Sequence, residues 1–101
     1  MLRHLVLLQF KPDTPPAAIA DITAAFRALP AAIDTVRALE SGTDVSPEGL
    51  ARGYTHAFLL TFDDAAGRDH YLPHPAHQAF VARLQPLLAD VLVIDYATDA
   101  A

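Results

Sequence analysis

Four apolar segments of strand length, separated by helical patterns, limit most strongly what this chain can fold into. They lie at residues 2–10, 36–44, 55–62 and 91–96. A helical segment follows the first, and an interrupted helical segment follows the third. The order strand, helix, strand, strand, helix, strand is the split βαβ pattern of ferredoxin-like folds.

This order predicts an α+β domain, a ferredoxin-like βαββαβ fold with a four-stranded antiparallel sheet. Right-handed crossovers place the strands in the spatial order four, one, three, two. Helices then cover one face of the sheet only. Because the strands are apolar on both faces, the second face needs a partner, and we expect a homodimer through that sheet face.

Local signals mark the helix ends. Thr14, followed by two prolines, predicts a helix start capped by the threonine hydroxyl, and Pro30 is expected to close this helix. A short helix is expected to run from residue 63 to residue 71. A second piece is expected from residue 75 toward residue 88, ended or kinked by Pro86.

Length and composition narrow the class. The 101 residues suit one domain over 1–101, and 52% hydrophobic against 19% charged residues favours oligomerisation. Seven basic and twelve acidic residues give a net charge of −5 with no basic cluster, so nucleic-acid binding is not expected. Neither a membrane span nor a cysteine is present, and we expect a cytoplasmic protein.

The stretch Tyr71-Leu72-Pro73-His74-Pro75-Ala76-His77 is the part of the chain densest in groups that transfer protons. Pro75 suits the first turn of a helix, with His74 at the helix entrance and His77 in the first turn. The helix dipole disfavours an imidazolium there, so a neutral His77 is expected as a base.

The predicted topology brings further polar groups to this stretch. The first and fourth strands are antiparallel neighbours, so His4 should lie close to Asp95. The third strand ends at the same edge and leads into residues 71–77, whereas His56 falls toward the opposite end. A carboxylate beside an imidazole, with a second imidazole and a phenol, suits proton abstraction next to a carbonyl and stabilisation of the enolate.

Each of these residues also has a structural interpretation. In this interpretation His4 and Asp95 pair only to satisfy two half-buried polar groups. Tyr71 serves as a core ring, and His74 serves as a helix-entry residue. A metal site using His74, His77 and an aspartate is a further alternative, but its spacing is unspecific. No metal and no cofactor is therefore predicted.

The chain resembles the stress-responsive A/B barrel (Dabb) family of the dimeric α+β barrel superfamily. The resemblance covers essentially the whole domain. It is carried by His4-Leu5-Val6, Phe10-Lys11-Pro12, Gly42 to Leu50, Gly53-Tyr54-Thr55-His56, the stretch from Tyr71 to His77, and Asp95-Tyr96.

The resemblance implies a monomer whose sheet packs against its twin to form a barrel. It also implies polyketide-cyclase-like aldol chemistry, in which His77 removes an α-proton, Tyr71 orients or protonates the acceptor carbonyl, and His4 and Asp95 support them. Ala25 and Phe26 stand where the cyclases place another pocket tyrosine. The residues expected to bind the substrate are His74, His56, Phe26 and Phe80.

Two functions therefore stay open. One is a cofactor-free enzyme for cyclisation or lyase chemistry on a small carbonyl or polyketide-like molecule held between sheet and helices. The other is a non-catalytic stress-response or small-molecule-binding dimer, in which the same histidines line a pocket or stabilise an edge.

Overall fold

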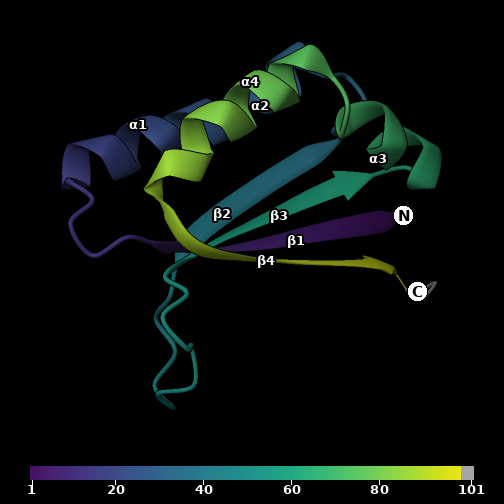
Figure 1. Ribbon diagram of the computed structural model, residues 1–101. Helices are drawn as coiled ribbons and strands as arrows, with labels where there is room; N and C mark the ends of the chain where they lie inside the picture. The colour runs from purple at the N-terminus through teal and green to yellow at the C-terminus, as the bar shows by residue number, and fades with distance from the viewer. Residues whose placement is uncertain (99–101) are drawn as a thin grey trace.

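The apolar segments form the four strands of one sheet, and the helical segments lie together on one face of it (Figure 1). The computed structural model describes residues 1–98, and residues 99–101 of the predicted domain lie outside the described part. The elements are β1 (Leu2–Phe10), α1 (Pro16–Arg27), α2 (Leu29–Ala32), β2 (Ala38–Thr43), β3 (His56–Phe62), α3 (Ala65–Tyr71), α4 (Pro75–Leu84), the 3-10 turn η1 (Gln85–Leu87) and β4 (Leu88–Ala97).

The sheet has the order β2-β3-β1-β4, with every neighbouring pair antiparallel. The predicted strand order and ferredoxin-like fold class are thus confirmed. The central strand β1 pairs His4 with Asp95 of β4 and with Leu60 of β3. Met1 and Thr98, the first and last described residues, lie side by side, because the backbone N–H of Thr98 donates to the Met1 carbonyl at 2.9 Å.

The helix-side face of the sheet carries the core. Directly opposite residues of antiparallel strands share a face, so alternate residues of β1 and β3 point toward the helices. Most of these are buried apolar side chains, whereas His4 is buried but polar, and Leu2, Phe10 and His56 toward the strand ends are only partly buried. An aromatic stack joins this face to α1: the rings of Phe26 and Phe58 lie 4.1 Å apart. Burial of each such ring contributes roughly 1.5–3 kcal/mol to folding.

No helix of the described chain lies over the other face of the sheet (Figure 1). Its centre is apolar, with Leu5 and Leu7 of β1 beside Leu59 of β3. On β4 the same face carries Leu92, Ile94 and Tyr96, which are 40%, 49% and 46% exposed. An apolar surface of this kind on a small domain is typical of an interface.

The ends of the helices differ from the predictions at two places. The Thr14 hydroxyl donates to the Lys11 carbonyl at 2.8 Å, and Pro15 occupies the N-cap position of α1 without a side-chain bond. Pro16 at the first helical position has no N–H to be capped. Pro30 does not close this helix: α1 ends at Arg27, and Pro30 lies in the first turn of α2.

The second helical region follows its proline and aspartate signals. The Asp64 carboxylate caps α3 by accepting from the Gly67 N–H at 2.9 Å. The helix α4 ends at Leu84, and Pro86 lies in η1, because proline cannot continue an α-helix. None of the helices within residues 1–98 has the length and apolar character that crossing a membrane requires.

The loop of residues 44–55 extends from the helix-free side of the sheet (Figure 1). A tight turn closes its base: the Tyr54 N–H donates to the Ala51 carbonyl at 3.1 Å, and Arg52 and Gly53 have φ of 59° and 87°. Positive φ at both central residues is typical of a type I′ turn. The Tyr54 hydroxyl then donates to the Asp90 carboxylate, which joins the loop to β4.

We expect Gly53→Ala to lower the free energy of unfolding by about 1–3 kcal/mol, because a side chain at positive φ is strained. An added Cβ also meets the flexible amide of Gln9 at 2.7 Å, which moves at little cost. Gly42→Ala is the matched control, since no atom lies within 4 Å of its added Cβ. Urea denaturation measures both variants, and equal stabilities would contradict the role of the turn.

Candidate functional site

The polar centre of the site begins with a buried histidine on the central strand. His4 is 6% exposed, and its Nδ1 lies 2.6 Å from Oδ1 of Asp95, its register partner on β4. Arg68 of α3 donates through Nη1 to the other carboxylate oxygen at 3.1 Å. Asp95 therefore joins two sheet strands to a helix through one carboxylate.

Tyr71 and His77 complete the group from the two helices that follow β3. The Tyr71 ring is buried and lies edge-on to His4, with centroids 6.0 Å apart, and its centroid is 4.4 Å from that of His77. Tyr71 comes three residues after Arg68, so both lie on the same side of α3. The predicted gathering of His4, Asp95, Tyr71 and His77 is thus present in the structure.

A backbone contact fixes the orientation of His77. Its Nδ1 lies 2.8 Å from the Leu72 carbonyl, and a carbonyl oxygen only accepts, so Nδ1 carries the proton. In the neutral ring Nε2 is then left with its lone pair. The break between α3 and α4 at residues 72–74 presents this carbonyl, because Leu72 lies beyond the end of α3.

Burial shifts the two central groups in ways that suit a base and a hydrogen-bond donor. Burial lowers the pKa of His77, the bond to the Leu72 carbonyl opposes this, and nearby His4 lowers the pKa further. Burial also raises the pKa of Tyr71 far above that of a free phenol. At neutral pH the site therefore holds a neutral imidazole beside a protonated phenol.

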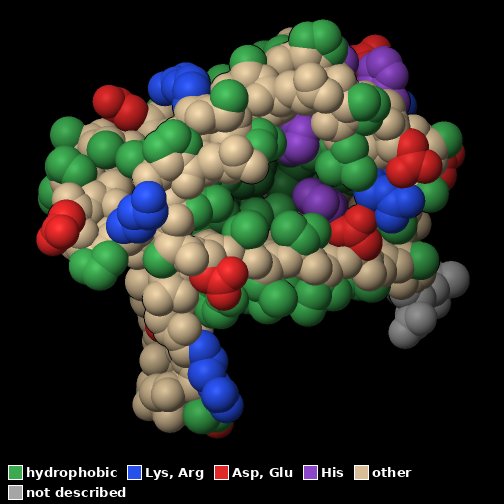
Figure 2. Space-filling view, viewed as in Figure 1, with side chains coloured by type: hydrophobic (Ala, Val, Ile, Leu, Met, Phe, Trp, Pro, Cys, Tyr) green, Lys and Arg blue, Asp and Glu red, His purple; other side chains and the backbone are tan. Residues whose placement is uncertain are grey.

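These groups line a cavity of about 340 Å³ between the helices and β4, which we name the site pocket. Figure 2 shows the hollow between the helix layer and β4, with histidine side chains at its wall and hydrophobic side chains around it. Its polar lining includes His4, Tyr71, His77 and Asp95. The apolar lining includes Val6, Phe26, Phe80, Val81, Leu84, Val91 and Val93.

The residues predicted to bind the substrate separate into three positions. Phe26 and Phe80 line the site pocket. His74 caps α4, with its Nδ1 accepting from the Ala76 N–H at 3.0 Å, and it does not line that pocket. His56 lies in a different groove between α1 and β2, edge-on to Phe10 with centroids 5.1 Å apart.

Arg68 is a polar residue of the site that was not among the residues predicted from the sequence. Its spacing from Tyr71 places both on one face of a short helix, and this signal was present in the sequence. Its bond to Asp95 could not be predicted without knowing how α3 packs over the end of the sheet. Among residues 1–98, no three histidine, aspartate or glutamate side chains are grouped so that they could hold a metal ion.

Fold and site together define a ferredoxin-like α+β domain with a histidine- and tyrosine-lined pocket between sheet and helices. The family model of the Stress responsive A/B Barrel Domain, Dabb, matches residues 2–98. The chain belongs to this family.

Two curated relatives extend over most of the chain. A stress-response A/B barrel domain-containing protein, HS1, from Arabidopsis thaliana is 37% identical over 95 residues, covering 94% of this chain and 87% of the relative. Olivetolic acid cyclase from Cannabis sativa is 27% identical over 95 residues, covering 94% of each chain. The similarity thus includes both a stress-response protein and a named enzyme.

Solved structures agree with the fold. A crystal structure of an Arabidopsis thaliana protein superposes with a TM-score of 0.94 at 35% identity, over 100% of this chain and 98% of the other. Hydroxynitrile lyase from Passiflora edulis gives 0.92 at 25% identity, over 99% and 94%. A dimeric ferredoxin-like protein from Thermobifida fusca gives 0.81 at 32% identity, over 96% and 90%.

We expect His77 to titrate below pH ~6.5, the usual value for histidine, in histidine-selective NMR spectra. A lowered pKa in the folded state means that the unfolded chain takes up the proton first as pH falls. The free energy of unfolding should therefore decrease as pH drops through about 6.5. His56, whose pKa burial also lowers, acts in the same direction.

The matched variant for this prediction is His77→Gln, whose amide does not titrate. Its stability should fall less steeply between about pH 7 and 5 than that of the wild type. An unchanged pH slope in urea titrations, or a His77 pKa above ~6.5, would contradict the electrostatic account.

Proposed function

We propose that this protein binds a small carbonyl compound in the site pocket and transfers a proton at the carbon next to the carbonyl. The observation that carries the proposal is the pairing of His77 and Tyr71, beside His4 and Asp95, in a pocket whose remaining lining is mostly apolar. The two relatives named as a cyclase and a hydroxynitrile lyase support enzyme chemistry on this fold.

The proposed step begins with Nε2 of His77 as the base. The α-carbon of the ligand loses its proton to Nε2, and the electron pair of that C–H bond forms the enolate. The Tyr71 hydroxyl donates a hydrogen bond to the enolate oxygen. Because burial raises the pKa of Tyr71, the phenol keeps its proton and acts as a donor rather than as an acid.

His4, Asp95 and Arg68 act in this proposal as positioning residues. The Asp95 carboxylate holds His4 at 2.6 Å, and the edge of the His4 ring packs against Tyr71. Arg68 donates to the other oxygen of Asp95 at 3.1 Å, so both oxygens of this carboxylate have a partner. Removal of any of the three should loosen the packing around Tyr71.

The exchange of α-protons for deuterium in small linear ketones, followed by proton NMR in deuterated buffer, tests this function. We expect the wild type to accelerate exchange, and His77→Ala to lower the accelerated rate by about a hundredfold or more. Tyr71→Phe should lower it as well. The rate should rise with pH through the His77 pKa, below ~6.5, since only the neutral ring accepts a proton.

Gln78→Ala, at the exposed neighbour of His77, is the control and should keep the full rate. Equal rates in wild type and His77→Ala would exclude the acid/base role. Ketones that raise the melting temperature of the wild type without exchange would instead identify a binding protein, which is the second candidate function.

We also propose that the protein is a homodimer through the helix-free face of the sheet. The apolar centre of this face, with Leu92 and Ile94 exposed on β4, supports the proposal. The Thermobifida fusca relative is described as dimeric, which agrees with it. Pairing of two such faces would close the two sheets into the barrel after which the family is named.

Size-exclusion chromatography with light scattering at micromolar concentration tests the dimer. The wild type should have twice the chain mass of 10.9 kDa, and Ile94→Asp should shift it toward the monomer, because a buried unpaired carboxylate is strongly unfavourable. Ala82→Asp, on the exposed side of α4, is the control and should leave the mass unchanged. A monomeric wild type would refute the interface.

A further inference from the structure

A second cavity, larger than the site pocket, is a groove on the opposite flank of the helix layer. This groove, of about 670 Å³, lies between α1 and the strands β2 and β3, and we name it the α1 groove. Its lining residues are Pro16, Ile19, Ala20, Thr23, Ala24, Arg27, Ala28, Ser41, Gly42, Thr43, His56 and Phe58.

An aromatic wall separates the two cavities. Phe26 stacks on Phe58 at 4.1 Å and contacts Phe80 at 4.7 Å between ring centroids. Phe26 and Phe80 face the site pocket, whereas Phe58 lines the α1 groove. A molecule bound in the α1 groove is therefore not in contact with His77 and Tyr71.

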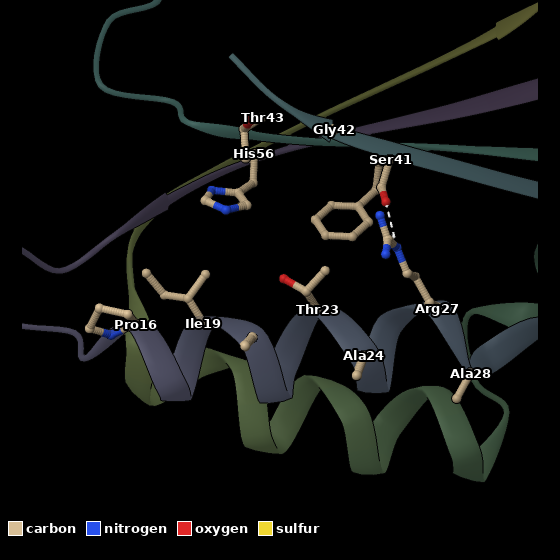
Figure 3. A pocket seen from close by; sticks show the side chains of 12 residues that line it. Pro16, Ile19, Thr23, Ala24, Arg27, Ala28, Ser41, Gly42, Thr43 and His56 are labelled. Carbon is tan, nitrogen blue, oxygen red and sulfur yellow. Dashed lines mark hydrogen bonds between the residues drawn. The ribbon is translucent and has the colours of Figure 1, made fainter. Parts of the chain in front are cut away.

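Side chains of α1 at a four-residue spacing form one wall of the α1 groove. Ile19, Thr23 and Arg27 point from this helix toward the sheet (Figure 3). Residues spaced by four lie on one face of a helix, so the three form a continuous strip. The strip is apolar at Ile19 and cationic at Arg27, so the two ends of this wall of the α1 groove differ in polarity.

The opposite wall of the α1 groove carries a polar group at each of the two ends. The Arg27 Nε donates to the Ser41 Oγ at 2.8 Å, which holds the guanidinium across one end (Figure 3). His56 points into the other end from β3, and its Nδ1 lies 2.8 Å from the Thr55 Oγ1. Small side chains at Ala20 and Ala24 leave the space between these ends open.

Arg27 differs from the arginines that form ion pairs. Within residues 1–98, Arg37 pairs with Asp63, and Arg68 pairs with Asp69 and Asp95, whereas no carboxylate lies within ion-pair distance of Arg27. Its single side-chain bond uses Nε, so the donors at its two terminal nitrogens face solvent or the α1 groove. A guanidinium held in this way is suited to bind a carboxylate.

We propose that the α1 groove is a second ligand-binding site, which takes a small carboxylic acid with an apolar body. The carboxylate binds the guanidinium of Arg27, and the apolar body lies along Ile19 toward His56, against the ring of Phe58. The α1 groove lies on the helix side of the sheet, so the proposed dimer leaves it accessible. The inference does not depend on the proposed proton transfer.

Calorimetric titration with octanoate and octanamide, which share an alkyl chain and differ in charge, tests the proposal. We expect octanoate to bind the wild type at least about tenfold more tightly than octanamide, because a charge-assisted bond is worth more than a neutral one. Arg27→Gln should remove this preference. Thr23→Phe, which fills the α1 groove, should weaken both ligands.

Two control variants distinguish binding in the α1 groove from binding elsewhere on the protein. Arg83→Gln removes an exposed arginine on α4 and should leave octanoate binding unchanged, as should His77→Ala in the site pocket. Circular dichroism confirms that each variant is folded. The proposal is overturned if the wild type binds no octanoate, if Arg27→Gln keeps the preference, or if His77→Ala abolishes binding.

Discussion

The central position of β1, with antiparallel neighbours on both sides, is the constraint on which the rest of the structure depends. It directs His4 of β1 into the core beside apolar side chains, and a buried imidazole needs a partner. The register supplies Asp95 directly opposite, at 2.6 Å. The second oxygen of Asp95 accepts a hydrogen bond from Arg68 of α3. The polar network thus follows from one strand pairing.

Two flanking cavities arise because the helices do not cover the full width of the sheet. The core lies over β1 and β3, whose helix-side residues are mostly buried, whereas β4 and most of β2 remain exposed. Each outer strand therefore forms one wall of a cavity whose other wall is a helix. The stacked rings of Phe26 and Phe58 fill the middle and keep the two apart.

The topology could be predicted from the sequence because it follows from the order of elements and from crossover handedness. That topology also placed His4 beside Asp95, since antiparallel register is a property of the backbone. The prolines also predicted that His74 stands at the helix entrance, but the side-chain hydrogen bonds of this stretch could not be predicted. His74 and His77 share one short motif, yet His74 caps its own helix and His77 bonds to the Leu72 carbonyl. The open space beside Ala20 and Ala24 depends on the distance between α1 and β2, which no local pattern encodes.

Burial is the main cause of the protonation states inside the site pocket. The full charges of Asp95 and Arg68 compensate each other at the edge of the pocket, where each side chain is about a quarter exposed, at 24% and 25%. The groups deeper inside, His77 and Tyr71, are shifted by burial toward their neutral forms. A charge inside the pocket is therefore unfavourable unless a ligand carries the opposite charge beside it. An enolate beside an imidazolium is such a pair, because each charge forms only when the other does, and both lie in surroundings that screen them little.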